Sequence, residues 1–345
     1  MLFIHKIACI SPQQTFSTVA IDALNESVEN KLKVIEPSYE GIPNNILRRM
    51  GKAVKMTVGA ALPLLENAKA LDGIIIGTAN GGMEDCIKFM NQIMEYDEGL
   101  LTPGNFVQST PNGLAAQIGL LKKNNGYNIT HVHRGLSFEN AVIDAAMMLN
   151  DFPENNYLLG AADEISSYNY NVDFLGGWYK KETVSNKNLY TLDSPASIAG
   201  EGAVMCIVNS KKEGALGQLK AIHTVHSEDK QYVMQELKAF LAQHLKNESP
   251  DILISGENGD NRFLPYYEAA EKLVDKTTNI LRFKHMSGEY PTASSHALWL
   301  ALHILQTGSF PNHCVKRKSE NRSFENILIY NNYKGAQHSF MLVSR

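Results

Sequence analysis

Buried strands that alternate with helical patterns, in two successive series, are the feature that most constrains how this 345-residue chain can fold. Residues 1–10 alternate like a strand, and residues 72–78 and 127–133 are apolar runs bounded by turn residues. Residues 135–149 follow with apolar side chains three and four positions apart, which is typical of a helix packed on a sheet. This order predicts an α/β layered protein.

A second series of elements fills the C-terminal part of the chain. After a further strand at residues 156–160, we expect this second series to have strands at residues 200–209, 219–226, 251–255, 326–330 and 339–343, and helices at residues 230–245, 264–274 and 293–305. Single cores stop growing at roughly 250–300 residues, so we expect two halves, residues 1–165 and 166–345. The stretch 166–199 has few periodic signals, and we expect a long excursion over the surface that lines a site.

Composition excludes several classes of function. The net charge is −4 and no dense Lys/Arg run occurs, which argues against nucleic-acid binding. No stretch reaches the roughly 20 apolar residues of a membrane span, and no cleavage site follows residues 1–10, so we expect a cytoplasmic protein. The four cysteines lack CxxC spacing and a matching histidine set, which predicts no disulfide framework, no metal site and no cofactor.

Five short motifs lie in one order along nearly the whole chain. They are GTANGG at 77–82, TPNGLAAQI at 110–118, GAADE at 160–164, GEGA at 200–203 and YKGA at 333–336. Their order and spacing resemble the GTxxGG, PNxxAxxI, AGGxE, GEGA and GFGG landmarks of β-ketoacyl-acyl carrier protein synthases. The resemblance implies a thiolase-like fold, in which two pseudo-repeated βα halves form an α-β-α-β-α sandwich.

The resemblance also implies a catalytic cysteine, which this chain lacks. Enzymes of the family acylate a cysteine at a strand-to-helix turn, where the helix N-terminus stabilises the thiolate. Matching Asn140 and Ala141 to the family's helix places the cysteine position at about His131. No cysteine occurs between Cys86 and Cys206, so the nucleophile is missing wherever the match falls within the turn.

The family's two catalytic histidines are also replaced. Where the family has HGTGT, residues 255–260 read SGENGD, and Ser255 stands at the start of the changed motif. Where the family has KxxxGH, residues 284–289 read KHMSGE, and Glu289 stands in place of the histidine. Covalent acyl transfer needs an acyl acceptor, so we expect no condensing activity from this chain alone.

Other readings of these residues are weaker. His131 and His133 lie two apart on a strand and could bind a metal on one side, but no third ligand is evident, and a hydrogen-bonded pair filling the old cavity is favoured. Ser137 has no identifiable base and reads as a helix-packing serine. Glu289 with Lys284 reads as a structural ion pair more readily than as an acid/base pair.

Loss of all three catalytic positions resembles the inactive subunit of chain-length-factor heterodimers. That resemblance implies a catalytically inactive subunit that pairs with a cysteine-bearing ketosynthase, or with itself, and shapes an acyl tunnel served by acyl carrier protein. Residues 106–117 should then lie at the dimer contact. The interface and tunnel candidates are Phe106, Gln108, Thr110, Asn112, Leu114 and His133.

The motif GEYPTAS at 288–294 narrows the resemblance further. It is similar to the ketosynthase-like subunit of aryl polyene and flexirubin-type pathways, which implies polyketide, aryl polyene or fatty-acid-type biosynthesis. Two alternatives remain open at this point. One is an enzyme of altered chemistry, a decarboxylase or hydrolase using His131, His133 or Glu289, and the other is a homodimeric binding or scaffold protein.

Overall fold

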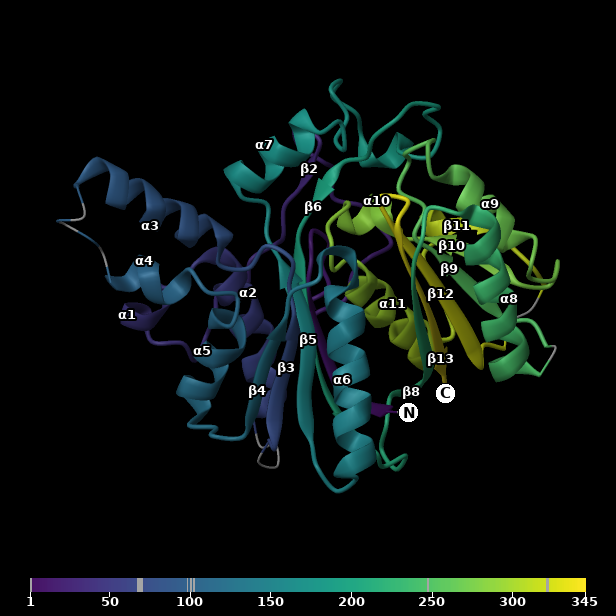
Figure 1. The fold of residues 1–345 in the computed structure, drawn as a ribbon. Helices are drawn as coiled ribbons and strands as arrows, with labels where there is room; N and C mark the ends of the chain where they lie inside the picture. The colour runs from purple at the N-terminus through teal and green to yellow at the C-terminus, as the bar shows by residue number, and fades with distance from the viewer. Residues whose placement is uncertain are drawn as a thin grey trace.

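The computed structural model describes residues 2–66, 71–97, 99, 101, 103–246, 248–320 and 323–345. Its described residues contain one mixed sheet with the strand order β11-β10-β9-β12-β13-β8-β1-β7-β5-β3-β4 (Figure 1). The strands are β1 (Leu2–Ile10), β3 (Gly73–Gly77), β4 (Tyr127–His131), β5 (Tyr157–Asp163), β7 (Gly202–Asn209), β8 (Gly217–His226), β9 (Ile252–Ser255), β10 (Asn279–Arg282), β11 (Val315–Arg317), β12 (Asn326–Tyr333) and β13 (Gln337–Ser344), with β2 (Lys31–Leu32) and β6 (Ala199–Gly200) paired apart from the sheet.

The helices fall between these strands. They are α1 (Asn44–Leu47), α2 (Lys52–Ala61), α3 (Met83–Glu95), α4 (Pro103–Gln108), α5 (Gly113–Lys122), α6 (Ser137–Asp151), α7 (Ser167–Leu175), α8 (Lys230–Leu245), α9 (Leu264–Glu271), α10 (Lys284–Ser287) and α11 (Ser294–Thr307), with short 3₁₀ turns η1 (Leu62–Leu65), η2 (Arg134–Leu136), η3 (Asn186–Asn188) and η4 (Asn312–Cys314). Among the described residues, no helix is long and apolar enough to span a membrane.

The two halves of the sheet repeat one topology. Numbered along the chain, the strands β1, β3, β4, β5 and β7 lie in the order 3-2-4-5-1 from the β4 edge inward, and β8, β9, β10, β12 and β13 lie in the same order from β10 inward. In each half the first three strands in that order are parallel, and the remaining pairings are antiparallel. A short pairing of β1 with β8 joins the halves. The predicted pair of βα halves is therefore confirmed.

The boundary between the halves differs from the expected division at 165/166. The expected division puts the strand at 200–209 in the second half. In the structure, β7 pairs antiparallel with both β1 and β5 and completes the first half. The chain passes to the second half between Asn209 and Gly217. The apolar run at 200–209 predicts a buried strand, but such a run does not tell which strands become its neighbours.

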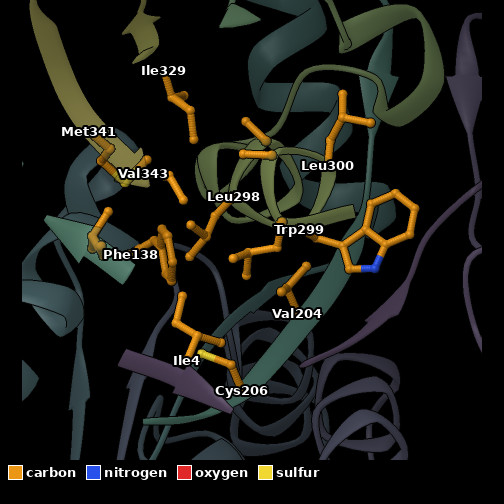
Figure 2. Close-up of a cluster of buried hydrophobic side chains, with 14 of the residues drawn as sticks. Ile4, Phe138, Val204, Cys206, Leu298, Trp299, Leu300, Ile329, Met341 and Val343 are labelled. Atoms are coloured by element: carbon orange, nitrogen blue, oxygen red, sulfur yellow. The ribbon is translucent and has the colours of Figure 1, made fainter. Parts of the chain in front are cut away.

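Helices cover both sides of each half of the sheet, which confirms the expected α-β-α-β-α sandwich (Figure 1). Alternation along β7 shows why: Val204 and Cys206 enter the central core, while Ala203 and Met205 enter an outer one. The central core contains residues of α6 and α11, such as Phe138 and Leu298 (Figure 2). Helices α2 and α5 form the outer layer of the first half, and α8 and α9 form that of the second.

The stretch 166–199 does more than cross the surface. It contains α7 and η3, and the side chains of Lys180, Asn186 and Ser197 are buried. Asn186 donates to the carbonyl of His285 at 2.8 Å, and Asn30 donates to the carbonyl of Lys180 at 2.9 Å. Polar side chains that bond backbone groups replace apolar periodicity here, so the sequence pattern looked irregular.

Candidate functional site

The turn between β4 and α6 holds the place where the resemblance puts a nucleophile. Strand β4 ends at His131, and Arg134 takes a φ of 51°, a left-handed conformation that is uncommon for a residue other than glycine. The Ser137 hydroxyl accepts the backbone N–H of His133 at 2.8 Å and donates to the carbonyl of Arg134 at 2.9 Å. The hydroxyl thus fastens a sharp turn, as expected for a structural serine, and the turn contains no thiol.

The expected hydrogen-bonded pair of His131 and His133 is not found among the described contacts, because the two side chains have different surroundings. His131 Nε2 is 2.8 Å from Asp144 Oδ2 of α6, and Tyr127 donates to the same oxygen at 3.1 Å. His133 is exposed. In the described part of the chain, neither belongs to a group of three metal-ligating side chains. His131 is therefore held as a partner of Asp144 at the sheet edge.

Tyr333 fills the space beside the turn. A Cβ added at Gly135 would lie 2.3 Å from Cβ and Cγ of Tyr333, so only a residue without a side chain fits there. Tyr333 ends β12, is buried and begins the YKGA motif. The space against the turn is thus taken by a ring from the second half of the chain.

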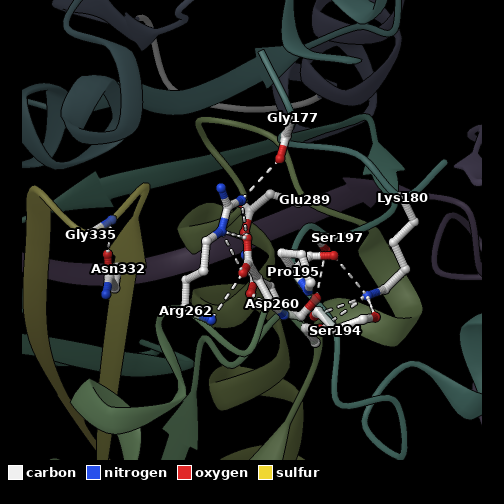
Figure 3. Close-up of polar contacts among 12 residues, drawn as sticks. Gly177, Lys180, Ser194, Pro195, Ser197, Asp260, Arg262, Glu289, Asn332 and Gly335 are labelled. Atoms are coloured by element: carbon white, nitrogen blue, oxygen red, sulfur yellow. Dashed lines mark hydrogen bonds and ion pairs between the residues drawn. The ribbon is translucent and has the colours of Figure 1, made fainter. Parts of the chain in front are cut away.

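Glu289 lies in the equivalent region of the second half, buried and fully paired. Lys284 Nζ is 2.7 Å from both Glu289 oxygens, and Asn258 donates to Oε2 at 2.6 Å (Figure 3 shows Glu289). The Lys284 side chain is completely buried. The expected ion pair is present, and three hydrogen bonds occupy the carboxylate.

Ser255 supports the same region from the end of β9. It is buried, and its hydroxyl accepts the backbone N–H of Glu257 at 3.3 Å. Glu257 in turn contacts Arg282 at 3.1 Å and Lys316 at 2.6 Å. Ser255 therefore orders the turn that replaces the HGTGT motif and has no charged partner of its own among these contacts.

The stretch 166–199 is fastened over Glu289 by two cations (Figure 3). Lys180 Nζ donates to Ser194 Oγ at 2.9 Å and to the carbonyls of Ser194, Pro195 and Gly259. Arg262 forms a bidentate pair with Asp260 and donates to the carbonyl of Gly177 at 3.0 Å. The bonds to Gly259 and from Arg262 join the stretch to the turn after β9, so that the stretch covers Glu289.

Little space is left beneath this cover. A cavity of about 20 Å³ is lined by residues that include Tyr179, Asn258, Glu289 and Tyr333. Such a volume holds about one water molecule. His131 is not part of the lining of this cavity, so the cavity does not bring His131 and Glu289 together.

Asp163 joins three of the sequence motifs. Its carboxylate accepts from Thr78 Oγ1 at 3.0 Å, from the backbone N–H groups of Ala79 and Asn80 at 2.9 Å, and from Thr292 Oγ1 at 2.8 Å. Burial raises its pKa, and the four hydrogen bonds act in the opposite direction. GTANGG, GAADE and GEYPTAS therefore meet at one buried carboxylate.

The interface candidates fall into three groups. Phe106, Thr110 and Asn112 are exposed, although Asn112 Oδ1 also accepts from Thr130 at 3.1 Å. Gln108 is used within the subunit, because its amide bonds the carbonyl of Arg49 and accepts the N–H of Gly51. Leu114 is fully buried in the outer core of the first half, so the expectation that it packs against a partner is wrong. Helix α5 turns that position toward α2.

The β-ketoacyl synthase N-terminal domain model matches residues 23–239, well over half of the chain. The chain belongs to the β-ketoacyl synthase family. Comparison with curated proteins gave no match. Between Cys86 and Cys206 the chain contains no cysteine, so the turn between β4 and α6 has none.

Solved ketosynthase structures share the fold. A β-ketoacyl synthase from Burkholderia phymatum STM815 gives a TM-score of 0.80 at 12% identity over 100% of this chain and 99% of its own. The ishigamide ketosynthase/chain length factor gives 0.78 at 13% identity over 99% and 98%. A type II polyketide synthase complex of acyl-carrier protein with its hexaketide-bound ketosynthase, AntDE:AntF, gives 0.74 at 18% identity over 99% of both chains. At these identities the likeness is one of fold.

Several residues that shape the site gave little sequence signal. In the sequence, Tyr333 is only the first residue of a glycine-containing motif. Lys180 and Arg262 are single basic residues in stretches without a periodic pattern. The left-handed backbone conformation of Arg134 cannot be read from a sequence. The only available hint was Gly135 directly after Arg134, since glycine there permits close approach of another segment.

Proposed function

We propose that this chain is a nucleophile-free, chain-length-factor-type subunit that pairs with a cysteine-bearing ketosynthase and shapes the tunnel for its partner's acyl chain. The turn between β4 and α6 carries the proposal. It has strand, sharp turn and helix but no thiol, and Tyr333 fills the space beside Gly135. Acyl transfer by the family's chemistry needs a nucleophile there. Such a subunit would act through the shape it gives to the partner's acyl tunnel and through the surface that contacts the partner.

The free edge of the sheet supports pairing with a second chain. Strand β4 ends the strand order, and its residues are exposed or half-buried. An unpaired edge strand presents N–H and C=O groups that another strand can bond. Large apolar side chains are exposed on the elements near this edge: Met90, Met94, Phe106, Val107, Leu120 and Val132 (Figure 1 shows α3, α4, α5 and β4 on one side).

We assign this face to a ketosynthase of the same fold. Phe106, Thr110 and Asn112 are the proposed contacts, with His133 beside them and Gln108 holding α4 against residues 49–51. His131, Ser255 and Glu289 are proposed as the degenerate equivalents of the catalytic set. The ishigamide structure, described as a ketosynthase/chain length factor, offers a model for such a pair.

The motifs and the structural neighbours support a proposal for the product class. One neighbour is a ketosynthase in complex with acyl-carrier protein, so we propose a carrier-bound acyl chain as the material the complex handles. GEYPTAS favours an aryl polyene or flexirubin-type product over an ordinary fatty acid. We place the complex in the cytoplasm. The cavity beside Glu289 in this chain is too small for a substrate, which disfavours a decarboxylase or hydrolase function.

Co-expression with the cysteine-bearing ketosynthase encoded nearest to this chain tests the proposal. The complex is purified through a tag on this chain, and condensation of malonyl-carrier protein is followed by mass spectrometry of the acyl products. A one-to-one complex that makes longer products than the partner alone would support the proposal. Absence of a complex, or products unchanged when this chain is omitted, would overturn it.

Paired variants locate the contact. Phe106→Asp with Val107→Asp should abolish co-purification, because two charges would enter a desolvated apolar contact. Tyr232→Asp places one charge on an exposed ring of α8, in the outer layer of the other half, and should leave the complex intact. If Tyr232→Asp reduced co-purification as much as the Phe106/Val107 variant does, the exposed face formed by α3, α4, α5 and β4 (the β4 face) would not be the interface.

A further inference from the structure

Four soft or nitrogen donor side chains meet between α10 and η4. His285 Nε2 is 2.8 Å from His313 Nδ1, and Cys314 Sγ is 3.6 Å from the same Nδ1. Three donor atoms, one each from His285, His313 and Cys314, all lie within 4.8 Å of one another. Met286 Sδ lies 3.4 Å from Cys314 Sγ. His285, Met286 and Cys314 are buried, and His313 is half-buried.

The surrounding hydrogen bonds point ring nitrogens into this cluster. His313 Nε2–H donates to the carbonyl of Ile21 at 2.7 Å, which leaves the Nδ1 lone pair directed at His285 and Cys314. Tyr190 Oη is 3.2 Å from His285 Nδ1 and can accept its proton, which frees His285 Nε2. An outer-shell acceptor behind each imidazole is the usual arrangement around metal-bound histidines.

From this geometry we propose that His285, His313 and Cys314 bind Cu⁺, with the Met286 thioether as a weaker fourth ligand. Thiolate, thioether and imidazole together are the donors that a soft monovalent cation selects. The inference does not depend on the proposed function. It contradicts the expectation of no metal site, which rested on the absence of CxxC spacing.

Charge decides between a monovalent and a divalent ion. One thiolate with Cu⁺ gives a neutral buried site, whereas Zn²⁺ would leave one uncompensated positive charge. The guanidinium of Arg282 lies 3.9 Å from the ring centroid of Tyr190, beside the cluster, and would oppose that extra charge. The site therefore favours the monovalent ion.

Binding involves no change of oxidation state. Cu–S and Cu–N bonds form, the thiol proton leaves to solvent, and the proton shared by the two imidazoles moves from His285 Nε2 to Nδ1. Nitrogen ligands at roughly 2.0–2.1 Å in a tetrahedral site lie about 3.3 Å apart, so the two rings separate slightly from their present 2.8 Å. The short helix α10 is then tied to η4.

The test is an anaerobic titration of the full chain with Cu⁺ against a chromophoric Cu⁺ chelator. Cys86 is only partly buried, so all samples carry Cys86→Ser to remove adventitious thiol binding. We expect one tight equivalent per chain. Cys314→Ser and His313→Gln should each weaken binding beyond the roughly 10–100-fold that loss of an outer-shell partner costs, and Tyr190→Phe should fall within that range.

Cys206→Ser is the matched control, since Cys206 is equally buried but bonds the carbonyl of Leu159 and is not one of the clustered donors. It should bind Cu⁺ as tightly as the Cys86→Ser parent. Circular dichroism of each apo variant shows that it is folded, and His313→Gln keeps the test valid if Cys314→Ser unfolds. Failure to bind one equivalent, binding unaffected by Cys314→Ser and His313→Gln, or tighter binding of Zn²⁺ than of Cu⁺ would overturn the proposal.

Discussion

The turns after β4 and after β10 hold equivalent places in the two repeats, and they are stabilised in opposite ways. Each follows the third strand of its half and leads to a central helix, α6 or α11. The first turn is exposed at His133 and Arg134 and is filled by the Tyr333 ring. The second is buried throughout α10 and is held by the Lys284–Glu289 pair. One topology thus accepts either steric filling or charge pairing at the turn that follows its third strand.

Glu289 and Glu164, one carboxylate from each half, have different partners. Glu289 in the second half has Lys284 as a direct partner. Glu164, at the end of β5 in the first half, accepts the N–H of Ala53 at 3.2 Å, and burial, followed by the nearby charge of Glu201, raises its pKa to about 7. Lys52, which lies close by, is paired with Glu201 instead. Both halves therefore contain a buried carboxylate paired with a lysine, but Lys284 is fully buried whereas Lys52 is partly exposed.

Removing Lys284 should have the largest effect. Lys284→Met leaves the buried Glu289 carboxylate with Asn258 alone, and the free energy of unfolding should fall by about 3–5 kcal/mol. Urea unfolding measures the change. Lys284→Met with Glu289→Gln should recover much of the loss, because no unpaired charge remains. Lys187→Met, which breaks an exposed pair with Glu26, should have no measurable effect, and a similarly small effect for Lys284→Met would contradict the role of the buried pair.

Neutralising Glu164 should stabilise the chain at high pH. Its raised pKa means that the folded state binds more protons than the unfolded state between about 4.5 and 7, so stability is lost as pH rises through that window. Glu164→Gln should then add about 3–4 kcal/mol at pH 8, at roughly 1.4 kcal/mol for each pKa unit, and little at pH 4. Urea unfolding across pH checks this. Parallel pH profiles for both proteins would show that Glu164 is not the titrating group.

Adding one methyl group to the first turn tests steric filling. Gly135→Ala places a Cβ against the Tyr333 ring, and overpacking of this kind should cost about 1–3 kcal/mol in urea unfolding. Gly113→Ala is the matched control, because a Cβ there meets nothing within 4 Å and α5 gains a better helix former. If both variants were equally stable, Tyr333 would not be packed tightly against the turn.

The fold followed from sequence because its signals are local. The helix at 230–245 begins and ends where predicted, since Asp229 accepts the N–H of Gln231 at 2.8 Å as an N-cap and apolar spacing marks the rest. The strand pattern also located β7 but not its partners. Helices α2 and α3 were not predicted, and strand β10 is only four residues long, too short for a period to show.

The candidate site was harder to predict because its members come from distant segments. The missing cysteine could be read directly, and so could the charge of Glu289 beside Lys284. That Tyr333 would occupy the first turn depends on β12 reaching across from the second half. Leu114 shows the converse: its motif suggested a contact surface, but the rotation of α5 about its axis buries it.

Changes on the exposed β4 face should have the smallest effect on the isolated chain. Met94→Gln and Val107→Thr alter exposed side chains of α3 and α4, so the free energy of unfolding should change by less than about 0.5 kcal/mol. Leu114→Ala, in the neighbouring helix, should cost about 2–5 kcal/mol because it empties a packed core position. The same two surface changes should weaken the complex with the ketosynthase in a pull-down titration. If the surface variants destabilised the isolated chain as much as Leu114→Ala, this face would be covered within the subunit. The contrast between an exposed first turn and a buried second turn would then no longer separate the two halves.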